Sequence, residues 1–298
     1  MTCTRLPRLL LGIALALALP ACGQSSTKVA DAAPVAGFDQ ALHDRLPEDV
    51  KERGEVLVAT DATYPPASSF ASDGRTIEGF EPDLAKQLGR VLGVDFTFVR
   101  TDFVDSLPSL EARRVDVVMS AMTDTVERQA QADFVDYFSA GTSILVQRGN
   151  PSGITDLRDL CGTTVAVLNG TIQVDLLERT QQTCDTAPIV IRSFPDNASA
   201  LLELRTGRAT AVLNDYPPAA RLTTDARTSA DYQLASTAQY EPGFYGVAVR
   251  KDNPLLRDAL QEALGRLIRS GEYAEVLERW DVSSGAVSSA TVNGGASA

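Results

Sequence analysis

The residues best suited to chemistry lie in the stretch 106–138, where a hydroxyl-rich turn precedes an arginine early in a predicted helix. All three residues of the turn 123–125 carry side-chain oxygens that can cap this helix, and Glu127 stands three residues after Asp124 in capping-box spacing. A helix N-terminus favours an anion, and the guanidinium group of Arg128 can donate two parallel hydrogen bonds to a carboxylate. This order of residues predicts an anion site.

Buried strands are expected to position these polar residues. The run 115–119 (VDVVM) predicts a strand buried on both faces, and it leads into Ser120. A second stretch, 204–215, has the same order of helix end, basic turn and strand, and it ends at Asn214 and Asp215. Open α/β sheets bind ligands just beyond the carboxyl ends of their strands. Strands and helices alternate along the chain, which predicts an α/β fold with parallel sheets flanked by helices.

Taken singly, these residues also allow other interpretations. Most arginines are solvated, so Arg128 could pair on the surface with Asp124 or Asp136. An aspartate after a strand, such as Asp215, more often caps a helix or lies in a solvated loop.

Six segments together resemble the amino-acid-type (family 3) solute-binding proteins of bacterial ABC transporters. They are GEVLVATDATYPPASSF (54–70), IEGFEPDLAKQLGRVLGV (77–94), the stretch 106–138, DLRDLCGTTVAVLNGTIQ (156–173), LLELRTGRATAVLNDYPPA (201–219), and the segment 245–280 from YGVAVR to LERW. The resemblance implies a two-lobed periplasmic-binding-protein fold with a ligand cleft between the lobes. It places lobe one at 54–142 plus 247–281 and lobe two at 149–238, joined by hinge strands at 143–148 and 245–250.

The resemblance also implies a role for each site residue. Arg128, helped by Thr123, would bind the α-carboxylate of an amino acid, and Gly170 and Thr171 would reach it from lobe two. Asp215, with Ser120, would accept hydrogen bonds from the ammonium group. The remaining expected ligand-binding residues are the aromatic walls Tyr64 and Phe98, together with Asp61, Ala121 and Gln173.

The side-chain preference of this site stays open. Ala121 and Ile172 stand where many family members carry a serine and a threonine, so two hydroxyl groups are missing. Asp61 is near the ligand side chain in some family members, but its motif TDATYPP is too widespread to establish a cationic ligand.

The two ends of the chain predict export and anchoring. Residues 1–21 have the two arginines and the apolar run of a secretory signal, and the run is too short to span a membrane. The tetrad LPAC resembles a lipobox, so we expect Cys22 to be lipidated, with an incidental cysteine after an ordinary cleavage site as the alternative. Residues 22–45 are expected to be a flexible linker, and 283–298 a disordered tail.

The charge and the cysteine and histidine content of the chain limit the partners and cofactors that it can have. The formal net charge is −12, and loss of residues 1–21 would leave −14, which argues against nucleic acid. Cys161 and Cys184 remain as an even pair in an exported chain, so we expect a disulfide; two free thiols or a metal site are the alternatives. The chain has one histidine and no CxxC motif, so no metal and no cofactor are expected.

The expected function is that of a monomeric, membrane-anchored receptor that captures a polar amino acid and delivers it to an ABC permease. The chain has no GxxxxGK[ST] loop, so the energy for import would come from an ATPase partner. One alternative is a dehydratase-like enzyme on the same scaffold, for which Glu78, Glu81 and Glu241 are nominal proton-transfer candidates, all three expected on the surface. A second alternative is a sensor that signals through a separate protein.

Overall fold

The computed structural model describes residues 36–185 and 187–295. The predicted signal sequence, Cys22, the first part of the predicted linker and the last three residues lie outside this part. The ten α-helices of the described residues are α1 (Gln40–Asp44), α2 (Glu48–Arg53), α3 (Phe80–Leu92), α4 (Ser106–Glu111), α5 (Val126–Gln129), α6 (Ile172–Gln181), α7 (Asn197–Arg205), α8 (Tyr216–Thr224), α9 (Pro254–Ser270) and α10 (Glu272–Arg279).

One continuous sheet runs through the described residues in the order β5-β1-β6-β12-β7-β10-β8-β9, and β11 and β13 also pair with β7. Its strands are β1 (Glu55–Thr60), β5 (Asp95–Arg100), β6 (Val117–Val118), β7 (Ala132–Gln147), β8 (Thr164–Leu168), β9 (Val190–Phe194), β10 (Ala211–Asp215), β11 (Tyr232–Leu234), β12 (Tyr240–Arg250) and β13 (Thr291–Val292). A small second sheet holds β2 (Thr63–Tyr64), β3 (Ser68–Phe70) and β4 (Ile77–Glu78). The predicted α/β class is confirmed.

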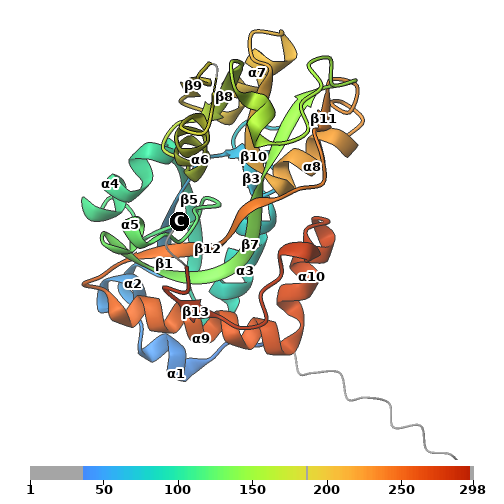
Figure 1. Cartoon of the computed structure of the whole chain (residues 1–298). Coiled ribbons are helices and arrows are strands. Elements are labelled where there is room, and N and C mark those ends of the chain that lie inside the picture. The colour runs from blue at the N-terminus through green and yellow to red at the C-terminus, as the bar shows by residue number, and fades with distance from the viewer. Residues whose placement is uncertain (1–35, 186, 296–298) are drawn as a thin grey trace, which may run out of the picture. The chain divides into compact units, whose positions relative to one another are not determined.

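Strand β7 links the two ends of the large sheet. Its first half pairs with β12 as far as Ala132↔Arg250, and its second half pairs with β10 and β11. In Figure 1, β7 and β12 pass between the group formed by β1, β5, α3 and α9 and the group formed by β8, β9, α6 and α7. The hinge strands predicted at 143–148 and 245–250 are therefore parts of two longer strands.

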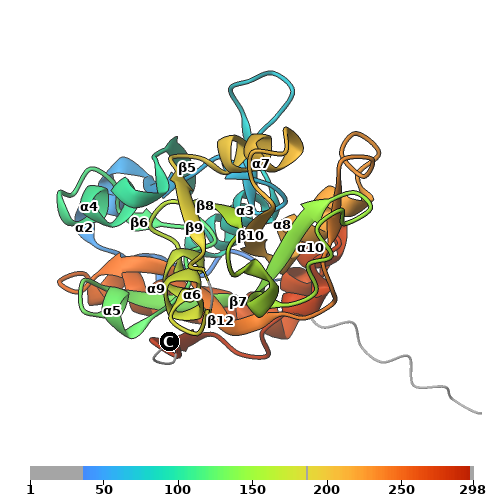
Figure 2. The same cartoon turned by 45° about the horizontal axis from the view of Figure 1, so that its top comes forward.

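Each of these two groups has its own hydrophobic core. The first is built from β1, β12, α3, α9 and α10, with Phe80, Phe138 and Tyr245 among its fully buried aromatic residues. The second is built from β8, β10 and α6, with further apolar packing under α7. Figure 2 shows α6 and α7 on either side of β8, and residues 165–168 of this strand are buried, whereas the edge strand β9 is largely exposed.

The structure corrects the expectations for both ends of the folded region. The predicted linker 22–45 includes helix α1, which Asp39 caps by accepting a hydrogen bond from the Leu42 amide. Leu42 is buried and packs into the first core, which explains why this polar-looking segment is helical. The predicted disordered tail contains a 3₁₀ turn at Ser283–Gly285 and strand β13, and it lies against β7.

Cys161 and Cys184 form a disulfide with a Cα–Cα distance of 5.6 Å, which confirms the predicted pair. It joins the segment before β8 to the end of α6.

Reduction of this disulfide should destabilise the second core. The two cysteines are 23 residues apart, and closing a loop of that size contributes about 3 kcal/mol by the chain-entropy estimate. We expect the double variant Cys161→Ser/Cys184→Ser to lose about this much free energy of unfolding in urea titrations. Dithiothreitol should lower the stability of the wild type in the same way and leave the double variant unchanged; equal stability of the two proteins without reductant would contradict the prediction.

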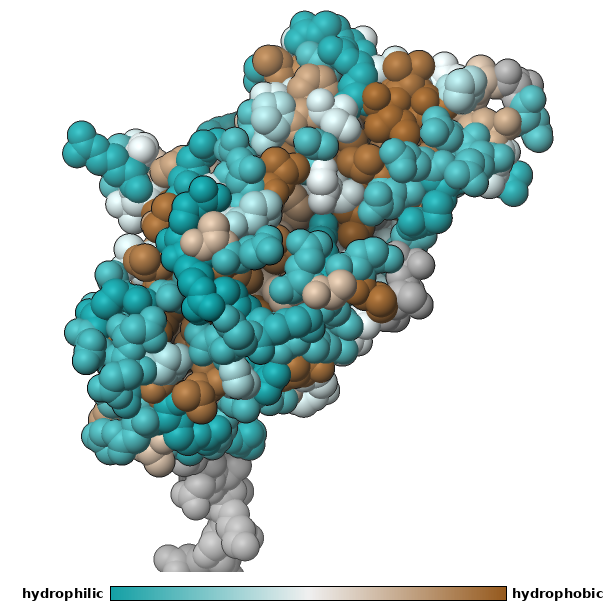
Figure 3. All heavy atoms as spheres, turned by 90° about the vertical axis from the view of Figure 1, so that its left-hand side faces the viewer, coloured by the Kyte–Doolittle hydropathy of each residue, from teal (hydrophilic) through white to brown (hydrophobic). Residues whose placement is uncertain are grey.

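Figure 3 shows the face that carries α4 and α5, where hydrophilic residues cover most of the surface and apolar ones are scattered in small patches. None of the helices in residues 36–185 and 187–295 has the length and apolarity needed to cross a membrane.

Candidate functional site

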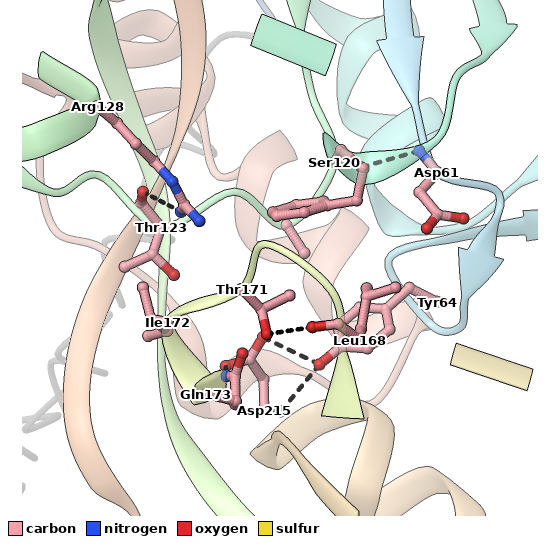
Figure 4. A pocket seen from close by; sticks show the side chains of 12 residues that line it. Asp61, Tyr64, Ser120, Thr123, Arg128, Leu168, Thr171, Ile172, Gln173 and Asp215 are labelled. Carbon is pink, nitrogen blue, oxygen red and sulfur yellow. Dashed lines mark hydrogen bonds between the residues drawn. The ribbon is translucent and has the colours of Figure 1, made fainter. Parts of the chain in front are cut away.

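A cavity with an empty volume of about 340 Å³, mouth included, lies where the two groups of elements meet. Figure 4 shows the side chains that surround it. Nine predicted site residues line it: Asp61, Tyr64, Ser120, Ala121, Thr123, Arg128, Thr171, Gln173 and Asp215. They come from segments up to about 150 residues apart in sequence, so the fold gathers the predicted residues in one place.

Arg128 reaches the cavity from α5. The Thr125 side chain caps this short helix by accepting a hydrogen bond from the Arg128 amide. The guanidinium group donates to the Thr123 carbonyl oxygen at 2.8 Å and to the Gly170 carbonyl oxygen at 3.0 Å, so it spans the two groups of elements. It also lies 5.5 Å from the centre of the Phe103 ring, within cation–π range. Arg128 is thus held by neutral acceptors and keeps its positive charge available.

The turn 123–125 caps α5 as expected, but through Thr125 and not in the capping-box spacing of Asp124 and Glu127. The alternative surface pairing of Arg128 is wrong. Asp124 does not cap α5; its carboxylate accepts hydrogen bonds from the Gln129 side chain at 2.8 Å and from the Gly295 amide at 2.8 Å. Asp136 is fully buried and accepts a hydrogen bond from Thr291. Both acids accept hydrogen bonds from the C-terminal segment and neither pairs with Arg128, whose side chain faces the cavity instead.

Asp215 lies at the carboxyl end of β10, on the other side of the cavity from Arg128 (Figure 4). One carboxylate oxygen accepts from the Tyr64 hydroxyl at 3.1 Å, and the other accepts from the Gln173 side-chain amide at 2.8 Å. The same Tyr64 hydroxyl accepts from the Asp215 backbone amide at 2.9 Å. Burial raises the pKa of Asp215 to about 6, because removal from water penalises the charged form.

Asp61 is a second buried carboxylate at the cavity. Its backbone amide donates to the Ser120 hydroxyl oxygen at 2.9 Å, which joins two of the predicted residues. Within the described part of the chain, neither of its carboxylate oxygens has a hydrogen-bond partner. Burial raises the pKa of Asp61. An unpaired buried carboxylate costs free energy, so this group is suited to receive a donor or a cation from a ligand.

Glu81 corrects another expectation, because it is fully buried rather than on the surface. Its carboxylate accepts from the Ser68 hydroxyl at 2.7 Å, from the Ala121 backbone amide at 2.6 Å and from the Tyr137 hydroxyl. Ala121 has a φ of 47°, a left-handed conformation that a non-glycine residue adopts only at a cost. Glu81 therefore stabilises the strained turn between Ser120 and Thr123, and it does not line the cavity. Glu78 and Glu241 are exposed, as expected.

Gly170 contacts Arg128 through its carbonyl oxygen, which accepts from the guanidinium group. Its φ is 73°, and a Cβ atom there would lie 2.7 Å from the Val104 side chain. Glycine thus allows a close approach between the two groups of elements. Thr171 lines the cavity, and its hydroxyl donates to the Leu168 carbonyl oxygen at 2.8 Å.

The prediction for Phe98 is wrong. Alternation along β5 points Phe96 and Phe98 to the same face, where both pack against the first core and border a separate groove beside α3. Phe103 is the second aromatic residue at the cavity besides Tyr64, and sequence reasoning missed it, along with Leu168, as a lining residue. Phe103 follows the carboxyl end of β5, just as Ser120 follows β6, so the strand-end rule could have found it.

Residues 56–283 match the family described as "Bacterial extracellular solute-binding proteins, family 3". The L-cystine-binding protein TcyJ of Escherichia coli (strain K12) is 33% identical over 232 residues, which cover 78% of this chain and 84% of that protein. The arginine-binding protein ArgT of Corynebacterium glutamicum is 29% identical over 252 residues, covering 83% and 81% of the two chains.

Solved structures of amino-acid-binding proteins have the same fold as this chain. An ancestral arginine-binding protein bound to arginine superposes with a TM-score of 0.71 at 34% identity, covering 76% of this chain and 98% of that one. The ancestral amino acid-binding protein AncCDT-1, a precursor of cyclohexadienyl dehydratase, superposes with a TM-score of 0.70 at 33% identity, covering 78% and 98%. The two-lobed fold implied by the sequence is confirmed.

Proposed function

Because this chain belongs to the family 3 bacterial extracellular solute-binding proteins, we propose that it captures a polar amino acid or a similar small zwitterion for an ABC importer. The observation that carries this proposal is that Arg128 and Asp215, with opposite charges, line one cavity from opposite lobes.

The chemistry of the cavity fits the two charged ends of an amino acid. Arg128 would exchange its contact with Gly170 for the α-carboxylate, because two parallel hydrogen bonds to an anion are stronger than one bond to a neutral carbonyl. Asp215, already held by Tyr64 and Gln173, would accept the ammonium group. A ligand that contacts both lobes favours the closed arrangement over the open one, since it gains both contacts only there.

Asp61 would select among ligand side chains. Its two unpaired oxygens favour a side chain that donates hydrogen bonds or carries a positive charge. The relatives named above bind cystine and arginine, and a further one, of Salmonella typhimurium, is a histidine-binding periplasmic protein. All three amino acids carry a donor or a cation and belong in the first test.

Delivery would involve a membrane permease that recognises the closed form. Lipid attachment at Cys22 would hold the receptor at the outer face of the cytoplasmic membrane, and the chain would act as a monomer.

Calorimetric titration of the purified protein with L-arginine, L-histidine, L-cystine and L-glutamine tests the proposal. We expect at least one of them to bind with a Kd near micromolar, which corresponds to about −8 kcal/mol. Removal of the α-carboxylate, as in agmatine for arginine, should abolish binding. If neither L-cystine nor any of the twenty amino acids binds, and no other small zwitterion does, the proposal is wrong.

Catalysis is the alternative, and one neighbour in the fold comparison is described as a precursor of a dehydratase. The buried carboxylates Asp61 and Asp215 have raised pKa values, as a proton-transfer group would. The family and the named relatives are binding proteins, and we propose that this chain is not an enzyme. Turnover of a prephenate-like acid, followed by absorbance, would contradict this.

Binding should weaken in acid. The carboxyl of Asp215 has a pKa raised to about 6 in the free protein, and an ammonium group binds only its charged form. Below pH 6 the group must first lose its proton, so we expect the Kd to rise by up to about tenfold per pH unit, and to change little between pH 7 and 8. Calorimetry at pH 5, 6, 7 and 8 measures this; an affinity that stays constant down to pH 5 would contradict it.

A further inference from the structure

The segment 286–295 runs back from the end of α10 across lobe one. Its first part packs on the core: the Val287 amide donates to the Tyr273 hydroxyl oxygen at 2.9 Å, and the Ala290 carbonyl oxygen accepts from the Gln261 side chain at 3.1 Å. The segment begins beyond residue 283, where the match to the family ends. It is therefore an addition whose role the family assignment does not explain.

The middle of this segment adds a strand to the edge of lobe one. Strand β13 pairs antiparallel with β7 in the register Thr291↔Asp136. Asn293 then pairs with Phe134 in both directions, its amide donating to the Phe134 carbonyl oxygen at 2.9 Å and its side-chain oxygen accepting from the Phe134 amide at 2.8 Å. These bonds cover an edge of β7 that β12 does not use.

The end of the segment binds two acids. Asp136 accepts from the Thr291 hydroxyl at 2.7 Å and from the Gly294 amide at 3.0 Å. Asp124 accepts from the Gly295 amide at 2.8 Å. A Cβ atom on Gly295 would lie 2.0 Å from the Asp124 carbonyl oxygen, so only glycine allows this approach. Burial, together with the charge of Asp124, raises the pKa of Asp136 to about 6, as expected for two acids enclosed together.

The bound acid Asp124 belongs to the turn that carries the ligand-facing arginine. It lies between Thr123, whose carbonyl oxygen holds the guanidinium group, and Thr125, which caps α5. Helix α5 has four residues and no buried ones, and a helix of that length is not stable by itself. Gln129, at its end, donates to both Asp124 at 2.8 Å and the Gly295 carbonyl oxygen at 3.3 Å. The turn and helix are thus fixed from the side opposite the cavity.

We propose that residues 286–295 form a strap that positions Arg128 by fixing the turn 123–129 from behind. None of the residues 286–295 lines the cavity, so we treat them as positioning residues. Its effect on affinity rests on the proposed function, whereas its effect on the turn does not.

Hydrogen exchange followed by mass spectrometry on the full chain, without ligand, tests the strap itself. In Gly295→Val the added side chain would displace the end of the strap from Asp124. We expect exchange in peptides covering 122–131 to become at least about tenfold faster, while peptides from β8 and β10 in lobe two keep their rates. Ser289→Ala, an exposed change within the same segment, serves as the control and should match the wild type.

Two outcomes would overturn the proposal: unchanged exchange in 122–131, or equal acceleration in both lobes, which would mean a general loss of stability. Thr291→Ala, which removes one hydrogen bond to Asp136, should give a smaller change in the same direction and covers the case in which Gly295→Val does not fold.

Calorimetry of the same variants with L-arginine and L-cystine then measures the effect on the site. We expect an amino acid that binds the wild type to bind Gly295→Val about tenfold more weakly. If neither binds the wild type, titration with all twenty amino acids decides the proposed function, while the exchange result still decides the strap.

Discussion

Asp215→Asn should weaken the binding of an amino acid by at least about 100-fold, since loss of one partner of a buried charge pair costs roughly 2–5 kcal/mol. Asparagine keeps the shape of the side chain and can still meet Tyr64 and Gln173. It loses the negative charge that the ammonium group requires. Calorimetry with the amino acid bound by the wild type measures the loss, and Arg128→Ala should have an effect of similar size through the α-carboxylate.

The fold should survive this substitution. Burial raises the pKa of Asp215, so ionisation costs the free protein stability as the pH rises through about 6. A neutral amide removes this cost at neutral pH, and we expect the thermal midpoint of Asp215→Asn without ligand to be no lower than that of the wild type. Asp231→Asn, in the same lobe but outside the cavity, is the matched control and should bind normally. Undiminished affinity in Asp215→Asn would refute the assigned site.

Glu81→Ala should destabilise the protein more than any other single change proposed here, by about 4 kcal/mol. The substitution leaves three donors without their acceptor, namely the Ser68 hydroxyl, the Ala121 amide and the Tyr137 hydroxyl, and a buried donor left unpaired costs about 1–3 kcal/mol. For a domain of this size the loss corresponds to a fall in Tm of roughly 8–16 °C. Calorimetric scanning and urea unfolding both measure it.

The matched control is Glu78→Ala, three residues earlier and exposed, which should stay within about 0.5 kcal/mol of the wild type. Glu81→Ala should also weaken amino-acid binding at temperatures well below its Tm, because the Ala121 turn beside Ser120 loses its anchor. A variant with wild-type stability would show that the Ala121 turn does not depend on Glu81.

The sequence alone was enough for the α/β class, the disulfide and most residues of the cavity. Polar residues placed at or just after the carboxyl ends of β6 and β10 could be recognised as candidates, since open α/β sheets bind ligands there. These two strands run in opposite directions, because three antiparallel pairings separate them in the sheet. Strand ends can be located from buried apolar runs, but it was the resemblance to the family that assigned Arg128 and Asp215 to one site. Such local patterns depend on residues close together in the chain.

Only the tertiary structure decided which partner each polar group has. Glu81 looked like a surface residue because its burial depends on Tyr137 and Ala121, which are distant in sequence. Phe98 was assigned to the wrong side because alternation along β5 does not say which face meets the cavity.

The C-terminal segment shows most clearly that local sequence does not specify the partners of a residue. Its small, polar composition predicts disorder, since it has little apolar surface to bury. The segment is ordered because β7 offers it an open edge and Asp124 and Asp136 offer it buried acceptors. Local composition determined which helices and strands could form, and contacts between distant residues decided how residues 286–295 lie against β7, Asp124 and Asp136.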